Sequence, residues 1–173
     1  MNAPTLIPGI ATDGSLFPIE KMAAHKGAIF HLAISVFLFD GPRLLIQRRA
    51  AHKYHCGSQW ANTCCSHPHW QESLSDCAHR RLREELGVRV PLTASCTVEY
   101  EADVGQGLTE HERVTFFLAD VRPQTLRMRL NPDEVSEVRW VAPAALRGEI
   151  AEAPERFTPW FRIYVERFPD LRF

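Results

Sequence analysis

The 173-residue sequence has no long hydrophobic run, no excess of either charge and few cysteines. Its longest apolar stretch, residues 32–39, is far shorter than the roughly 20 residues that a membrane-spanning helix requires. The formal net charge is −1, so the sequence does not favour nucleic acid or an anionic membrane as a partner. No basic segment leads into an apolar core near the N-terminus, and we expect no secretory signal.

The five cysteines are odd in number and lack the spacing of a disulfide framework. Free thiols in a reducing compartment explain this pattern best, and we therefore expect a cytoplasmic protein. The length is that of one ordinary domain, and a composition of 45% hydrophobic and 24% charged residues is typical of globular proteins. We expect residues 1–15 to be a mobile N-terminal segment and residues 16–173 to form a single domain.

Strand and helix patterns alternate irregularly along the chain. A turn is predicted at Asp40-Gly41-Pro42, and a long loop is expected over residues 50–71. This irregular order favours an α/β (α+β) fold, with a mixed sheet sandwiched by helices, over a doubly wound parallel sheet. Strands are predicted at residues 31–39, 43–48, 97–101, 112–121 and 136–141.

A helix over residues 74–86 is the clearest prediction, because leucine or alanine recurs every fourth residue there. Ser73 and Asp76 have the spacing of a capping box, with Asp in place of the usual Glu or Gln. Gly87 stands where a left-handed C-terminal cap is expected. Thr158 and Pro159 predict the N-cap and the first position of a C-terminal helix.

Residues 66–88 match the Nudix box pattern, G-x5-E-x7-R-E-U-x-E-E-x-G-U with U aliphatic, except at two positions. Ser66 replaces the opening Gly, and Arg81 replaces the first Glu of the Arg-Glu pair. The alternative is a solvated charged helix, in which an Arg81–Glu85 pair contributes about 0.3–0.5 kcal/mol. The register of the box instead favours carboxylates that hold Mg²⁺ against phosphate oxygens. The residues that match are Glu72, Arg80, Leu82, Glu84, Glu85, Gly87 and Val88.

The substitution at Arg81 bears on the reaction. Nudix hydrolases use the acidic residue at this position for the metal and base chemistry of hydrolysis. A cation there would weaken metal binding and suit a bound diphosphate. The box in this chain therefore predicts a site that binds a diphosphate and does not cut it.

Further motifs extend the resemblance to nearly the whole chain, from about residue 18 to residue 165. In order they are EKMAAH at 20–25, HLA at 31–33, RRA at 48–50, WAN at 60–62, CSHP at 65–68, Tyr100, EHE at 110–112 and TPW at 158–160. Together they resemble the type I isopentenyl-diphosphate isomerases of the Nudix superfamily. One departure lies at residues 54–57, where the family has an aromatic-Pro-Gly run and this chain lacks the proline, so the geometry of this loop stays open.

The resemblance implies an isomerase that interconverts isopentenyl and dimethylallyl diphosphate for isoprenoid biosynthesis. One proton is added and another removed on opposite faces of the substrate, through a carbocation-like intermediate. The two transfers are assigned to Cys65 and Glu112, with Tyr100 as a hydrogen-bonding helper beside Glu112. Trp160 would stabilise the carbocation, because the face of an aromatic ring attracts positive charge.

The same resemblance implies two sites for divalent metal ions. Glu110 and Glu112 lie two residues apart on a predicted strand and so project from one face. With His25, His31 and His67 they would bind Mn²⁺, Zn²⁺ or Mg²⁺, among which affinity order does not decide. The other histidines are interpreted as surface or packed residues: His52, His55, His69, His79 and His111.

The expected ligand is a small allylic or homoallylic diphosphate, with no nucleic-acid or membrane partner, bound by a monomer. Mg²⁺ at Glu85 would accompany the diphosphate, since Mg²⁺ prefers hard oxygen ligands. The diphosphate itself would be held by cations: Lys21, Arg49, Lys53 and Arg81.

Two other functions fit parts of the sequence. A Nudix hydrolase that cleaves a nucleoside diphosphate derivative would explain the box, but it needs neither Arg81 nor three histidines. A non-catalytic, metal-stabilised binding module would leave Cys65 facing Glu112 without a purpose.

Overall fold

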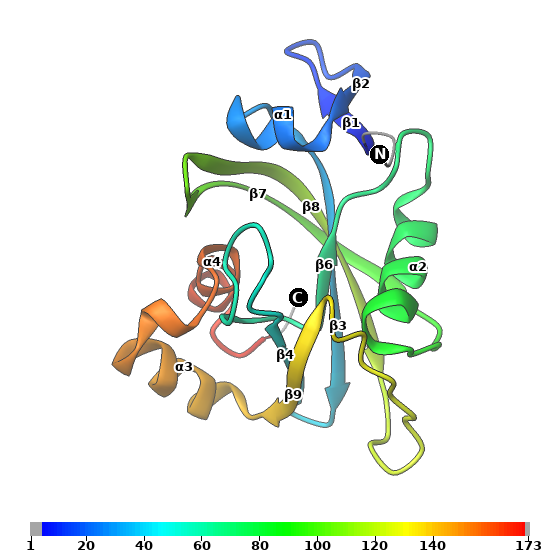
Figure 1. Ribbon diagram of the computed structural model, residues 1–173. Helices are drawn as coiled ribbons and strands as arrows, with labels where there is room; N and C mark the ends of the chain where they lie inside the picture. The colour runs from blue at the N-terminus through cyan, green and yellow to red at the C-terminus, as the bar shows by residue number, and fades with distance from the viewer. Residues whose placement is uncertain (1–4, 172–173) are drawn as a thin grey trace.

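The computed structural model describes residues 5–171, in which a mixed sheet lies between helices (Figure 1). The strands within this range form one nine-stranded sheet: β1 (Leu6–Ile10), β2 (Leu16–Glu20), β3 (His31–Asp40), β4 (Arg43–Arg49), β5 (Trp60–Ala61), β6 (Cys64–Ser66), β7 (Thr93–Gly105), β8 (Leu108–Asp120) and β9 (Val135–Val141). The helices are α1 (Lys21–Lys26), α2 (Leu74–Leu86), α3 (Pro143–Glu152), η1 (Pro154–Arg156) and α4 (Pro159–Arg167). This single-domain arrangement confirms the predicted fold class.

Strand β3 is the centre of the sheet. It runs parallel to β8 over almost its whole length, with His31 opposite Glu112 at one end and Phe39 opposite Asp120 at the other. Its other edge pairs antiparallel with β6, where Ser35 lies opposite Cys65, and with β4 beyond the turn. The sequence between β3 and β8 forms a hairpin, a loop, α2 and β7, which gives the long connection that a parallel pair needs.

Both faces of β3 are buried, which explains its almost continuous hydrophobic sequence. Ile34, Val36 and Leu38 share one hydrophobic core with α2. Ala33 and Phe37 alternate with them and share a second core, on the opposite face, with residues of α4. In Figure 1, α2 and α4 accordingly lie on opposite sides of the sheet.

Helix α2 has the predicted bounds. The Ser73 hydroxyl accepts a hydrogen bond from the Asp76 backbone N–H at 3.0 Å, as a capping box requires. Gly87 ends the helix in the left-handed conformation, with φ of 69°. The predicted Thr158–Pro159 start of α4 is confirmed as well, although the Thr158 side chain makes no capping hydrogen bond. No helix among residues 5–171 is both long and apolar enough to span a membrane.

The structure differs from two expectations. Residues 1–15 were expected to be mobile, yet residues 6–10 form β1, which pairs with β2 and buries Ile7 completely; residues 1–4 lie outside the described range. Residues 50–71 were expected to be one loop, but β5 and β6 interrupt it. Pro8 and Gly9 obscure the strand pattern of β1, and strands of two or three residues are too short to show a period.

Replacing Gly87 by alanine should lower the free energy of unfolding by about 1–2 kcal/mol, because L-residues disfavour this left-handed backbone. A Cβ there would also lie 3.0 Å from the Arg129 backbone nitrogen and oxygen. Urea denaturation measures the change. Gly148→Ala is the matched control: its Cβ would have no neighbour within 4 Å, and alanine should stabilise α3 by up to about 1 kcal/mol. Equal stability of Gly87→Ala and the wild type would contradict the assigned cap.

Candidate active site

One cavity brings together most of the residues with a predicted role. They are Lys21, Arg49, Lys53, Cys65, His67, Arg81, Glu85, Tyr100, Glu110, Glu112 and Trp160. His25 and His31 do not line this cavity, but both are completely buried, with ring centroids 5.0 and 4.9 Å from that of His67. The residues predicted from sequence therefore form one compact cluster.

The register of the sheet explains why Cys65 and Glu112 reach the same cavity. Residues directly opposite each other on neighbouring strands project from the same face. Cys65 lies opposite Ser35 and Glu112 opposite His31, and these two β3 residues share a face because they are four positions apart. Cys64 lies on the other face and packs in the core under α2.

Two imidazoles carry a free lone pair at the centre of this cluster. His25 Nδ1 lies 2.7 Å from the Lys21 carbonyl oxygen, and His31 Nδ1 lies 2.6 Å from the Ile29 carbonyl oxygen. A carbonyl only accepts, so each Nδ1 must carry the proton and each Nε2 the lone pair. This hydrogen bond from the second ring nitrogen is the usual support of a metal-binding histidine.

The Glu112 carboxylate lies beside two of the imidazoles, those of His31 and His67. Glu112 Oε1 lies 2.7 Å from His67 Nε2 and 3.4 Å from His31 Nε2. Ligand atoms of His25, His31, His67 and Glu112 all lie within 4.8 Å of one another. Opposite ligands of an ion with bonds of about 2.1 Å are about 4.2 Å apart, so this group could hold a divalent metal ion with small side-chain adjustments.

Glu110 belongs to a second group that overlaps the first. Its ligand atom lies within 4.8 Å of those of His25 and His55. The Tyr100 hydroxyl joins the two carboxylates, at 2.8 Å from Glu110 Oε2 and 2.7 Å from Glu112 Oε2. His55 was interpreted as a surface or packed residue, and its position in the cavity was missed because a single histidine in a loop gives no sequence signal.

Burial shapes the protonation of the cluster. It lowers the pKa of His67 to about 3 and that of His55 to about 2, so both rings are neutral and able to bind a metal. Burial and the Glu112 charge raise the pKa of Glu110 well above its usual value. Burial also raises the pKa of Glu112, but the contacts with His67 and His31 outweigh it and hold that pKa well below its usual range. Glu112 therefore ionises at a lower pH than Glu110.

Cys65 on β6 and Trp160 on α4 line the same cavity. Burial raises the pKa of Cys65, which keeps the thiol protonated near neutral pH. Trp160, at the start of α4, donates from its indole nitrogen to Asn62 Oδ1 at 3.3 Å. The guanidinium carbon of Arg49 lies 5.3 Å from the centre of the Trp160 ring, a cation–π contact.

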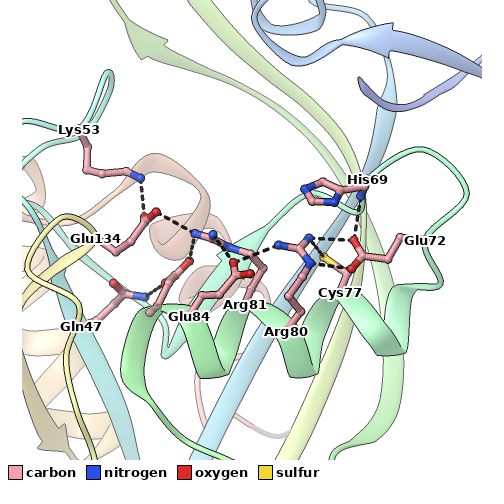
Figure 2. Close-up of polar contacts among 10 residues, drawn as sticks. Gln47, Lys53, His69, Glu72, Cys77, Arg80, Arg81, Glu84 and Glu134 are labelled. Carbon is pink, nitrogen blue, oxygen red and sulfur yellow. Dashed lines mark hydrogen bonds and ion pairs between the residues drawn. The ribbon is translucent and has the colours of Figure 1, made fainter. Parts of the chain in front are cut away.

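A network of charged residues forms the rest of the site (Figure 2). Arg81 Nη2 lies 2.8 Å from Glu85 Oε1 and 3.1 Å from Glu134 Oε1. Lys53 Nζ lies 2.5 Å from Glu134 Oε2, and Gln47 donates to Glu85 Oε2 at 2.8 Å. Glu134, which pairs with two of the predicted diphosphate-binding cations, was not identified from sequence, because it lies outside the box and no spacing links it to the site.

Comparisons with known proteins show the family of this chain. A family model of the NUDIX domain matches residues 29–161. A curated protein of Cereibacter sphaeroides named isopentenyl-diphosphate Delta-isomerase is 54% identical over 154 residues, which are 88% of this chain and 86% of that protein. One of the same name from Dinoroseobacter shibae is 52% identical over 162 residues, 93% and 92% of the two chains.

Solved structures show the same fold at lower identity. A Deinococcus radiodurans protein superposes with a TM-score of 0.71 at 18% identity, covering 94% of this chain and 98% of the other. A MutT NUDIX hydrolase from Burkholderia pseudomallei gives a TM-score of 0.61 at 22% identity, covering 80% and 98%. The fold, the matched domain and the identity to the curated relatives agree: this chain belongs to the Nudix domain family and, within it, to the isopentenyl-diphosphate Delta-isomerases.

Proposed function

We propose that this protein interconverts isopentenyl diphosphate and dimethylallyl diphosphate in isoprenoid biosynthesis. The observation that carries the proposal is the single cavity lined by Cys65, Tyr100, Glu112 and Trp160. A thiol and a carboxylate can exchange protons with an alkene held between them, and the cations of the same cavity suit its diphosphate.

Cys65 and Glu112 are the proposed acid and base. In one direction a proton is added to the terminal methylene carbon, and a second proton leaves the neighbouring carbon of the carbocation-like species. The protonated thiol of Cys65 and the ionised Glu112 suit these opposite roles, which exchange when the reaction reverses. The hydrogen bond from Tyr100 would hold the carboxylate of Glu112 in position.

Trp160 is the proposed partner of the carbocation-like species. The large ring is buried and lines the cavity, and Arg49 already lies over it as a cation–π partner. The attraction of a cation to a desolvated indole face is worth about 2 kcal/mol. An aromatic ring also offers no lone pair that would react with the cation.

Lys21, Lys53, Arg49 and Arg81 are the proposed partners of the diphosphate. Arg81 and Lys53 are paired with Glu85 and Glu134 in the free protein, so binding would exchange a carboxylate for a phosphate oxygen. Glu85 is the proposed ligand of the Mg²⁺ that accompanies the diphosphate. His25, His31, His67, Glu110 and Glu112 are proposed to hold a further ion, Mn²⁺, Zn²⁺ or Mg²⁺, which when bound would orient Glu112 and lower its affinity for a proton.

The sequence supports three proposals about the setting of this reaction. The net charge of −1 argues against nucleic acid and anionic membrane as partners. Five free cysteines suit a reducing compartment, so we propose a cytoplasmic location. We also propose that the protein acts as a monomer, because residues of a single chain suffice to line the cavity and it needs none from a second copy.

Incubation with isopentenyl diphosphate and Mg²⁺ in D₂O, followed by NMR, tests the reaction. Protonation from an exchanged thiol or carboxyl group should place deuterium at the allylic positions and give a mixture of the two isomers. Release of phosphate or pyrophosphate without isomer formation would contradict the isomerase and favour a hydrolase.

Cys65→Ser and Glu112→Gln should each lower turnover by at least about 100-fold, the usual contribution of a positioned acid or base. Circular dichroism checks that each variant is folded. Cys96→Ser, a half-buried thiol on β7, is the matched control and should retain full activity. Normal turnover by either active-site variant would remove that residue from the mechanism.

The affinity for substrate should decline as the pH rises through about 8. Burial, together with the nearby charges of Lys53, Arg81 and Arg49, lowers the pKa of Lys21 to about 8, and the Glu110 charge opposes this shift. Lys21 is charged below this pH and neutral above it, so its attraction for a diphosphate is lost on the alkaline side. The pH profile of kcat/KM reports this group in the free enzyme. Lys21→Arg keeps its charge and should flatten the decline; an unaltered profile would contradict the assignment.

A further inference from the structure

His55 is buried in the active-site cavity without a hydrogen bond to either ring nitrogen from the residues in the 5–171 range. Its side chain is only 3% exposed. Buried polar atoms are nearly always paired, and leaving one unpaired is costly. The backbone carbonyl of His55, by contrast, accepts a hydrogen bond from Arg49 Nη2 at 3.2 Å, whereas neither ring nitrogen has a hydrogen bond among residues 5–171.

The His55 ring faces the Glu110 carboxylate. His55 Nε2 lies 3.5 Å from Glu110 Oε1, whereas Glu110 Oε2 is bonded to Tyr100. The His55 ring also stacks on His25, with centroids 5.9 Å apart and an angle of 26° between the planes. The remaining sides of the ring are closed by Tyr54 at 4.3 Å and Trp160 at 5.8 Å, both edge-on aromatic contacts.

The two metal-binding groups share one histidine lone pair. His25 belongs to the group with His31, His67 and Glu112 and also to the group with His55 and Glu110. Its Nδ1 is bonded to a carbonyl, so only Nε2 can bind a metal. One lone pair binds one ion, so two separate ions cannot both use His25, and a single ion between the two groups is the arrangement that uses all six side chains.

We propose that His55 is a further ligand of this ion, so that four imidazoles and two carboxylates complete a six-coordinate shell. The inference rests on the proposed metal site but not on the proposed reaction. Five ligands are expected from the sequence, and His55 supplies the sixth donor of an octahedral arrangement. A shell with four nitrogen donors favours a first-row transition ion such as Mn²⁺ or Zn²⁺ over Mg²⁺, which prefers oxygen.

X-ray absorption spectroscopy on the Zn²⁺-loaded protein tests this ligand directly, since it counts imidazoles bound to the metal. The wild type should show four imidazoles, and His55→Gln should show three. His55→Gln should also lower the affinity for Mn²⁺ at least about tenfold in a competition assay. The matched control is His52→Gln, a histidine of the same loop with a 64% exposed side chain, which should behave as the wild type.

A second variant distinguishes the loss of a metal ligand from a change in packing at residue 55. His55→Cys offers a thiolate in place of the imidazole, so its Co²⁺ form should show a thiolate-to-cobalt charge-transfer band that His52→Cys lacks. Equal imidazole counts and affinities in the wild type and His55→Gln, or no such band, would overturn the assignment of His55. A wild-type protein that binds no Zn²⁺ or Mn²⁺ would overturn the metal site as a whole, whatever its isomerase activity.

Discussion

The pairing of β3 with β8 on one edge and with β6 on the other is the interaction on which the site depends. Its register places His31 opposite Glu112 and Ser35 opposite Cys65, so that the proposed acid, the proposed base and a histidine share one face of the sheet. A slip of one residue in either pair would turn Cys65 or Glu112 toward α2. The residues of β3 oppose such a slip, since it would exchange the side chains that pack under α2 with those that face the cavity and α4.

The burial of charged and polar groups in the candidate active site lowers the stability of the fold. The site buries two carboxyl groups joined by Tyr100, together with histidines whose Nε2 or Nδ1 atoms have no hydrogen bond among the described residues. Such groups normally destabilise a fold, and their concentration in one cluster indicates that a ligand completes them. Arg81 is a second case in which a ligand would complete a partly buried group. Glu85 and Glu134 neutralise its charge in the free protein, and the diphosphate of the proposed substrate would take their place.

The sequence predicted the parts of the molecule that local patterns determine. Helix α2 has its predicted bounds because Ser73 and Gly87 mark its ends, and β3 was recognised by its length and hydrophobicity. The short strands β5 and β6 were missed, because only their pairing with β4 and β3 makes them strands. His55 and Glu134 were missed for a related reason: each joins the site through the fold alone, outside any motif.

A crystal structure with Mg²⁺ and the saturated analogue isopentyl diphosphate tests the central claim most directly. The account predicts the hydrocarbon tail between the Cys65 sulfur and the Glu112 carboxylate, with the diphosphate against Lys21, Lys53 and Arg81. A tail bound away from Cys65 and Glu112, with the diphosphate on another surface, would contradict it.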